Sequence, residues 1–300
     1  MKIGVVIQLV EISDLGRALS WAEIKDTVLY VEDLGFDSIW VYDHLLYRTK
    51  KGETTGIWEG WSMLSAMAAI TQKVELGTLV ACNSFRNPAV LAKMAHTVDE
   101  ISGGRLTLGI GAGWNQPEYE AFGIPFDHRV SRFEEAVQII QPLLKIGKVD
   151  FAGKYYQSKD CEIKPTSPRT DGIPLMISAF GPRMMKIAAQ YADLWNVCYM
   201  SIPRSTEKLN RSFHKSCKSM GRELESIKQT YTVHLAYPDL LGWNQDKKRG
   251  ILSGSIEEIA QTLIEYEQLG STHLMFHLSP STPEAYQRLA RSVEIYRNLK

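Results

Sequence analysis

Residues 74–111 read VELGTLVACNSFRNPAVLAKMAHTVDEISGGRLTLGIG and combine two strand-like runs with a helical pattern between them. Two short runs rich in apolar and β-branched residues, 74–80 and 106–111, have the length and composition of strands. Between them, residues 88–101 repeat apolar side chains at helical spacing. A strand, a helix and a second strand in this order are typical of a βαβ unit, in which the two strands run parallel.

The same alternation extends outward to both ends of the chain. Strands are predicted at 3–7, 38–42, 74–80, 106–111, 174–178, 194–197, 229–235 and 273–278. Helices are predicted at 21–34, 60–71, 88–101, 131–146, 182–192, 204–220, 255–269 and 282–298. Eight strand and helix pairs in 300 residues predict an α/β protein, a (β/α)8 TIM barrel with insertions, in a single domain over residues 1–300.

Capping residues support several of these boundaries. Asn87-Pro88 and Gly181-Pro182 each place a capping residue before a proline at the first helical position. Glycines follow three predicted helices, where a left-handed residue commonly ends a helix: Gly35, Gly103 and Gly270.

Three stretches exceed the minimal barrel and are interpreted as insertions at about 48–57, 148–172 and 237–250. The first and third follow the carboxyl ends of strands, where barrel enzymes build their active sites, so both are candidate substrate lids. The middle insertion alternates polar and apolar residues around a Gly-Lys turn, which predicts an external hairpin.

The composition favours small molecules as partners. Lys plus Arg and Asp plus Glu both number 34, so no net positive field attracts nucleic acid or anionic lipid. With 44% hydrophobic and 23% charged residues, the chain can bury the large core that a parallel barrel requires.

Cysteine usage and the N-terminal segment indicate a cytoplasmic protein. The four cysteines lack a metal-ligand spacing, which points to reduced thiols, and the histidines show no H-x-x-x-H or H-E-x-x-H pattern, so no metal site is predicted. The chain starts without a basic leader and an apolar core, and no apolar run approaches the roughly 20 residues that span a bilayer. Neither secretion nor membrane insertion is expected.

Polar side chains follow the second, third and fourth strands. Asp43 and His44 come after strand 38–42, and an acid beside an imidazole at a barrel rim could position a ligand and move a proton. The alternative is a capping aspartate and a histidine satisfied by the backbone. Cys82 follows the third strand and could equally be a small buried filler. The glycines of 109–113 permit close approach of a planar ligand or of another backbone, and their spacing does not fit a dinucleotide fingerprint.

The turn after the fifth strand is a candidate phosphate site. It includes Ser178, and the N–H groups of Ala179, Phe180, Gly181 and Arg183 could cradle a phosphate at the start of the next helix. The alternative is an ordinary turn that binds no anion.

Four tryptophans near predicted rim segments suggest an aromatic pocket or plain packing: Trp58, Trp61, Trp114 and Trp195. Hydrolase and nucleotide-hydrolysis motifs are absent from the sequence.

Four segments together resemble the luciferase-like monooxygenase superfamily: EDLGFDSIWVYDHL (32–45), LGTLVACNSFRNPAVLAKMAHTVDEISGGRLTLGIGAGWNQPEYEAFG (76–123), RFEEAVQII (132–140) and PLMISAFGPRMMKIAAQYAD (174–193). The resemblance implies a (β/α)8 barrel that uses reduced FMN with oxygen, or the deazaflavin coenzyme F420 in hydride transfer. It also implies a small-molecule substrate, a flavin or F420 reductase partner for some members, and a homodimer.

The resemblance carries roles to individual residues. Asp43 and His44 look like the family's rim pair, with His44 beside the reactive ring. Leu79 and Val80 match the place where many deazaflavin-dependent members carry a non-prolyl cis peptide. The other implied positions are pocket-lining Cys82 and Asn115, and the phosphate turn at 178–181 with Arg183.

One position departs from the family pattern. Deazaflavin-dependent sugar-phosphate dehydrogenases carry a carboxylate after the G-x-G of the fourth strand, and this sequence has Trp114 there. The departure argues for a bulkier or more apolar substrate, with Trp61 and Trp114 lining its pocket and Glu118 reaching in from the next turn.

The expected cofactor is F420, because TLVACNSFRNP (78–88) resembles the dehydrogenase and reductase members. Arg48, Lys50 and Lys51 could meet the carboxylates of the F420 tail, although a solvated charged lid explains them equally well. Two alternatives remain: an FMN-dependent monooxygenase with a separate flavin reductase, and a non-catalytic flavin-binding homologue.

Overall fold

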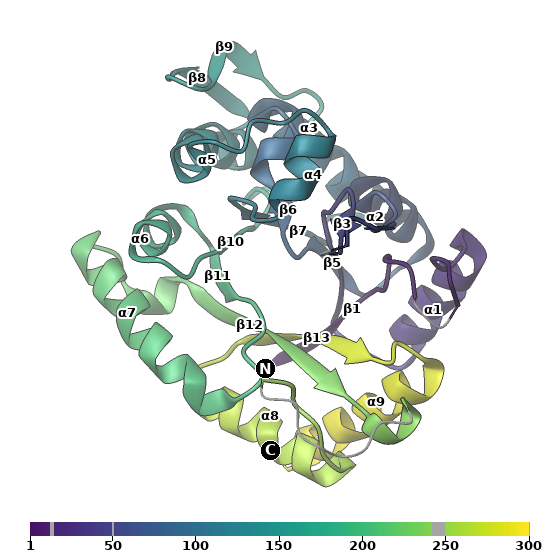
Figure 1. Cartoon of the computed structure of the whole chain (residues 1–300). Helices are drawn as coiled ribbons and strands as arrows, with labels where there is room; N and C mark the ends of the chain where they lie inside the picture. The colour runs from purple at the N-terminus through teal and green to yellow at the C-terminus, as the bar shows by residue number, and fades with distance from the viewer. Residues whose placement is uncertain (13–14, 50, 242–249, 300) are drawn as a thin grey trace. The chain divides into compact units, whose positions relative to one another are not determined.

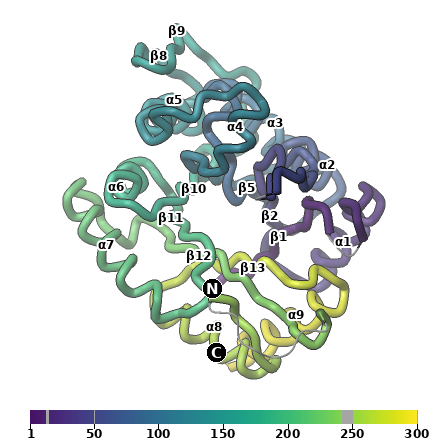
Figure 2. Tube along the Cα trace, viewed as in Figure 1, coloured from purple at the N-terminus to yellow at the C-terminus, as the bar shows by residue number. Residues whose placement is uncertain are grey.

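The computed structural model describes residues 1–12, 15–49, 51–241 and 250–299 (Figures 1 and 2). Eight parallel strands form the repeating part of the fold: β1 (Lys2–Val6), β2 (Ser38–Val41), β5 (Glu75–Thr78), β7 (Leu106–Gly111), β10 (Leu175–Ser178), β11 (Leu194–Val197), β12 (Lys228–Ala236) and β13 (His273–Ser279). The helices that follow them are α1 (Trp21–Asp33), α2 (Gly60–Ile70), α3 (Pro88–Ile101), α5 (Arg129–Ile146), α6 (Pro182–Tyr191), α7 (Thr206–Ser219), α8 (Ile256–Gln268) and α9 (Pro283–Asn298). The strand and helix order confirms the predicted (β/α)8 TIM barrel.

The chain divides into two compact units, and the first comprises Met1–Gln8, Ile24–Trp40 and Ser178–Lys300. Its strands lie in the order β11-β12-β13-β1-β2, and every neighbouring pair is parallel. Val5 of β1 lies opposite Phe276 on one side and Ile39 on the other, and all three side chains are fully buried. Helices α8 and α9 lie side by side along this unit (Figure 1). The single-domain organisation stays a prediction.

The second unit comprises Leu9–Glu23 and Val41–Ile177. Its long strand β7 pairs with β5 at one end and with the two-residue strand β6 (Ala81–Cys82) at the other, and β10 pairs along its opposite edge. Helix α3 packs against both α2 and α5. Between β5 and β6 the peptide bond Leu79-Val80 is cis, as the resemblance implied.

The insertions differ in how well they were predicted. The expected external hairpin is confirmed as the antiparallel pair β8 (Lys148–Ala152) and β9 (Gln157–Glu162). The first insertion holds a short antiparallel ribbon that was not predicted, β3 (Tyr47–Arg48) with β4 (Thr54–Thr55). Most of the third insertion, 242–249, lies outside the described residues. Short helices add to the barrel: α4 (Gln116–Ala121) and the 3₁₀ turns Asn83–Phe85, Pro203–Ser205, Leu224–Ser226 and Pro238–Leu240.

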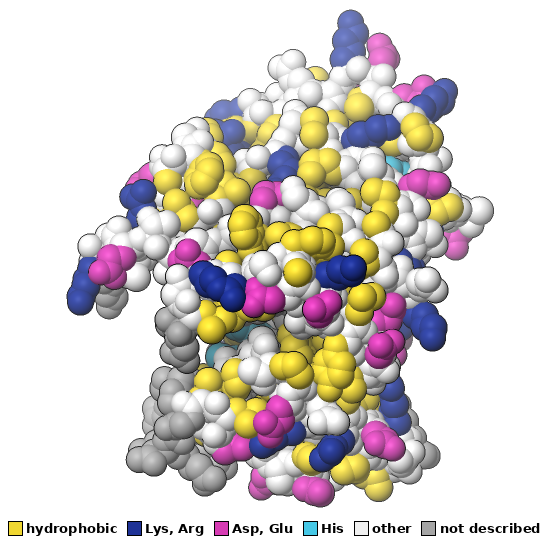
Figure 3. Space-filling view, turned by 90° about the vertical axis from the view of Figure 1, so that its right-hand side faces the viewer, with side chains coloured by type: hydrophobic (Ala, Val, Ile, Leu, Met, Phe, Trp, Pro, Cys, Tyr) yellow, Lys and Arg dark blue, Asp and Glu magenta, His cyan; other side chains and the backbone are white. Residues whose placement is uncertain are grey.

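The predicted caps and surface character also have counterparts in the structure. The Asn87 side chain accepts a hydrogen bond from the N–H of Ala89 at 2.9 Å, and Gly103 ends α3 with a positive φ of 66°. Acidic and basic side chains are interspersed on the face in Figure 3. Among the described residues, no helix combines the length and the apolar character that a bilayer crossing requires.

Candidate active site

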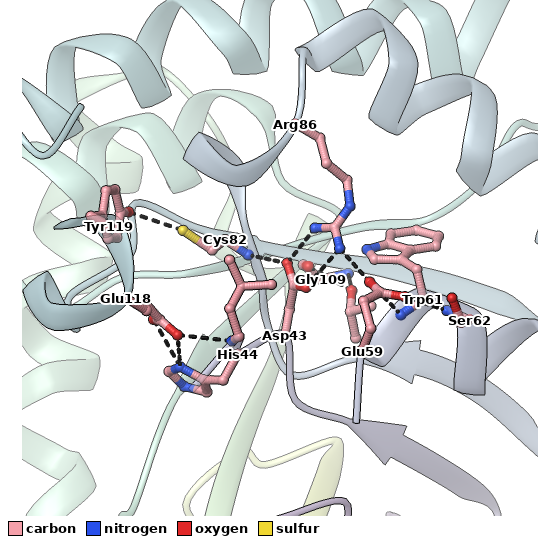
Figure 4. Close-up of polar contacts among 12 residues, drawn as sticks. Asp43, His44, Glu59, Trp61, Ser62, Cys82, Arg86, Gly109, Glu118 and Tyr119 are labelled. Atoms are coloured by element: carbon pink, nitrogen blue, oxygen red, sulfur yellow. Dashed lines mark hydrogen bonds and ion pairs between the residues drawn. The ribbon is translucent and has the colours of Figure 1, made fainter. Parts of the chain in front are cut away.

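Asp43 lies just after β2 and is held by three hydrogen bonds (Figure 4). Its carboxylate accepts from two Nη atoms of Arg86, at 2.8 and 3.0 Å, and from the N–H of Cys82 at 2.8 Å. Only 2% of Asp43 is exposed. Burial raises the pKa of Asp43, and the positive charge of Arg86 opposes that rise. Both carboxylate oxygens are thus occupied by protein donors.

Arg86 extends this network to the start of α2. Its Nη2 also donates to Glu59 Oε1 at 2.5 Å, and Glu59 caps α2 by accepting from the N–H groups of Trp61 and Ser62 at 3.1 and 2.7 Å. One guanidinium therefore joins the chain after β2, the chain after β6 and a helix N-terminus. The fork of Arg donors suits two carboxylates at once.

The His44 side chain points toward α4, where its ring contacts the carboxylate of Glu118 (Figure 4). His44 Nδ1 lies 3.0 and 3.2 Å from the two carboxylate oxygens of Glu118, and Glu118 Oε2 also accepts from the N–H of Leu45 at 2.9 Å. Glu118 is 1% exposed. This carboxylate is a partner of His44 in the structure, which differs from the predicted role of reaching into a substrate pocket.

Two aromatic rings flank His44. Tyr47 lies 4.6 Å away between ring centroids, and Trp114 lies edge-on at 5.6 Å and 75°. Trp114 is 66% exposed, so it presents apolar surface beside the imidazole. His44 Nε2 has no hydrogen-bond partner within the described part of the chain. The imidazole is thus anchored at one nitrogen and open at the other.

Cys82 is buried against Tyr119 at the far side of α4. Its Sγ lies 3.0 Å from the Tyr119 hydroxyl, and burial raises the pKa of the thiol to about 12. The thiol is therefore protonated at neutral pH and is no nucleophile. Gly113 has a φ of 76°, and a Cβ there would overlap both side chains. Only glycine fits that position.

The glycines of β7 lie in close contact with a neighbouring backbone segment of the same protein. A Cβ at Gly109 would overlap the carbonyl oxygen of Thr78, and a Cβ at Gly111 would lie 2.8 Å from Val80 Cγ2. Of the two predicted explanations for this glycine face, the structure shows the close approach of another backbone segment, Thr78 to Val80. Leu79 is 5% exposed, and Val80 is half-buried.

Two further predicted pocket residues, Asn115 and Trp61, are buried in the second unit. Asn115 is 7% exposed and donates from Nδ2 to the carbonyl of Leu46 at 2.9 Å. Trp61 is 2% exposed and belongs to the hydrophobic core, and its place on a pocket wall stays a prediction. A core tryptophan on the first turn of α2 is explained by packing alone.

The predicted phosphate turn belongs to the first unit. The N–H of Ala179 donates to the carbonyl of Asn196 at 3.1 Å, which corrects the prediction that Ala179 offers a free donor. The N–H groups of Phe180 and Gly181 make no hydrogen bond within the described residues. Gly181 caps α6 ahead of Pro182, and both Phe180 and Arg183 are exposed. Ser178 Oγ lies 3.7 Å from the thiol of Cys198.

Sequence reasoning missed Arg86, Glu59 and Tyr119. Glu59 lies one residue before α2, and Arg86 lies two residues before α3. At such positions a charged side chain is usually interpreted as a solvent-exposed helix cap. The network depends on ion pairs between residues far apart in the sequence, and no local sequence pattern predicts such pairs.

A family model described as luciferase-like monooxygenase matches residues 1–239. The chain belongs to the luciferase-like monooxygenase family. One member, the F420-dependent glucose-6-phosphate dehydrogenase of Amycolatopsis mediterranei (strain U-32), is 27% identical over 303 residues, covering 84% of this chain and 88% of the relative. Another, the pyrimidine monooxygenase RutA of Agrobacterium fabrum (strain C58), is 31% identical over 222 residues, covering 70% of this chain and 59% of the relative.

Among solved structures, an F420-dependent secondary alcohol dehydrogenase in complex with an F420-acetone adduct superposes with a TM-score of 0.81. It is 20% identical and covers 99% of both chains, so this likeness supports the fold. The prediction of a luciferase-like oxidoreductase is confirmed, because the chain belongs to this family and the two relatives named are a dehydrogenase and a monooxygenase.

Proposed function

We propose that this luciferase-like protein uses coenzyme F420 to transfer a hydride to or from a small organic substrate, with His44 handling the proton. The observation that carries the proposal is the imidazole at the end of β2, anchored through Nδ1 and open at Nε2. A ring held in this way can exchange a proton with a substrate hydroxyl or carbonyl through Nε2. The cofactor, when bound, supplies or accepts the hydride.

The turn before α6 is proposed to hold the phosphate of the cofactor. The free N–H groups of Phe180 and Gly181, at the start of the ten-residue helix α6, fit a phosphate, assisted by the Arg183 charge. Ser178, Leu79, Val80, Cys82 and Asn115 are proposed to line the cofactor site. Ala179 contributes backbone geometry and no donor, since its N–H is already bonded.

Asp43 is proposed to act through position. Because its oxygens accept from Arg86 and Cys82, it holds the chain at His44 and carries no proton to substrate. Trp114 is proposed as the substrate wall beside His44. An indole in place of a carboxylate favours an apolar substrate over a sugar phosphate, although one relative is a sugar-phosphate dehydrogenase.

The choice of F420 over FMN is supported by likeness to an F420-dependent dehydrogenase across most of both chains. Arg48 and Lys51 are exposed and could attract the carboxylates of the F420 tail; Lys50 lies outside the described residues. Fluorescence titration with each cofactor at low and moderate salt tests this. We expect F420 to bind more tightly and with greater salt sensitivity, and tighter FMN binding at both salt concentrations would replace the proposal.

The second candidate is an FMN-dependent monooxygenase served by a separate flavin reductase, favoured by the 31% identity to a pyrimidine monooxygenase. Oxygen consumption with FMN and a reductase distinguishes it from F420-linked turnover. A non-catalytic homologue would bind a cofactor but show neither F420-linked turnover nor oxygen consumption with FMN. A cytoplasmic homodimer is proposed by analogy with the family, and light scattering of the purified protein checks the dimer.

A further inference from the structure

We infer that Glu118 fixes the tautomer of His44 so that Nε2 is a proton acceptor when substrate binds. The inference rests on the proposed function for its kinetic consequence, and its structural part stands on the second unit alone. It makes Glu118 a positioning residue that acts through His44 and touches no substrate.

The hydrogen-bond inventory of Glu118 requires this tautomer. A carboxylate carries only acceptors, and Glu118 already accepts from the backbone N–H of Leu45 through Oε2 at 2.9 Å. Its oxygens lie 3.0 and 3.2 Å from His44 Nδ1, so the ring hydrogen belongs on Nδ1. A neutral imidazole carries one N–H, and Nε2 is then left with its lone pair.

The position of Glu118 is itself held. It is the third residue of α4, and its N–H donates to the carbonyl of Asn115 at 3.2 Å. The side chain of Asn115 in turn donates to the carbonyl of Leu46. The start of α4 is therefore joined to the chain after His44 at two places, Leu45 and Leu46. Figure 4 shows Glu118 aimed at His44 from α4.

This arrangement defines which nitrogen of His44 exchanges the proton with the substrate. In oxidation of an alcohol, the hydroxyl proton passes to His44 Nε2 while the hydride leaves the carbon for the cofactor and the C–O bond becomes C=O. The imidazolium so formed lies beside a buried carboxylate, which stabilises the positive charge. In the reverse direction, the same imidazolium returns the proton to the carbonyl oxygen.

Glu118→Gln tests the inference because an amide has one acceptor and one donor group. If the amide oxygen keeps the Leu45 N–H, its NH₂ meets Nδ1, and Nδ1 must then accept. We expect ¹⁵N NMR of histidine-labelled protein to show protonated Nδ1 in the wild type and protonated Nε2 in Glu118→Gln. The His44 signal is identified by its loss in His44→Asn. Glu120→Gln is the matched control, since Glu120 lies on the same helix, is exposed, and its carboxylate accepts only from the Gln116 side chain among the described residues.

The kinetic readout uses a panel of primary and secondary alcohols with F420. We expect kcat of Glu118→Gln to fall about 10²-fold, as for loss of a general base, with KM within about threefold and Glu120→Gln unchanged. An unaltered tautomer in Glu118→Gln, or an altered tautomer with unaltered kcat, overturns the inference. If the wild type turns over no alcohol with F420, alcohols are excluded as substrates of the proposed function, and the NMR comparison still decides the role of Glu118.

Discussion

Two histidines of this chain, His44 and His273, are both hydrogen-bonded to side chains, yet they occupy opposite ends of their strands. His273 opens β13, is 4% exposed and bonds the hydroxyl of Ser38 at 2.7 Å, with Trp40 edge-on to its ring. His44 follows β2 and bonds the carboxylate of Glu118. A neutral partner in the core fits a structural histidine, whereas a carboxylate partner at the carboxyl end of a strand fits the catalytic role that we propose for His44. We therefore propose two roles for the same residue type, according to its position on the strand.

The sharpest test of this contrast removes the imidazole at the carboxyl end. His44→Ala should lower kcat with F420 and alcohols by about 10²–10⁴, because the group that exchanges the proton is gone. F420 affinity should stay within about tenfold, measured by fluorescence titration. An unchanged turnover number would remove His44 from the mechanism.

The charged network beside His44 should matter more for stability than for chemistry. Arg86→Met leaves Asp43 buried without its cation, and we expect a loss of about 3–5 kcal/mol in the free energy of unfolding, measured with urea. Asp43→Asn in the same background should recover part of that loss, because the uncompensated charge is then absent. Equal stability of Arg86→Met and the wild type would show that the ion pair contributes nothing.

His273 should make stability depend on pH in a defined direction. Burial, followed by the positive charges of Lys2, Lys228 and the N-terminus, lowers its pKa from 6.5 to about 3. Between these values the unfolded chain binds a proton that the folded protein does not, so stability falls as pH drops, by up to about 1.4 kcal/mol per unit. Unfolding curves of the wild type and His273→Gln from pH 7 to 4 should diverge. Parallel pH profiles would contradict the assignment of a neutral core histidine.

The smallest expected effect lies in the phosphate turn. Gly181→Pro deletes one of the two free N–H groups and restricts φ, so F420 affinity should fall about tenfold. The Ala179 N–H already bonds the carbonyl of Asn196 and offers the phosphate nothing, so the expected loss comes from the Gly181 N–H. Equal affinity of Gly181→Pro and the wild type would place the phosphate elsewhere.

The sequence alone determined the order and nearly the bounds of all eight strand and helix pairs, because hydrophobic periodicity and capping are local properties. Helix α3 was predicted at 88–101 and observed at Pro88–Ile101. Helix α4 was missed, because six residues hold too few turns to show a period.

Local sequence also placed His44 and Asp43 at a strand end. Their partners were decided only by tertiary structure: Glu118 lies 74 residues from His44, and Arg86 lies 43 residues from Asp43. The glycines of β7 permitted either a ligand or a neighbouring strand, and folding placed Thr78 and Val80 there. A side chain's role depends on which atoms reach it, and those atoms come from segments that meet only when the chain has folded.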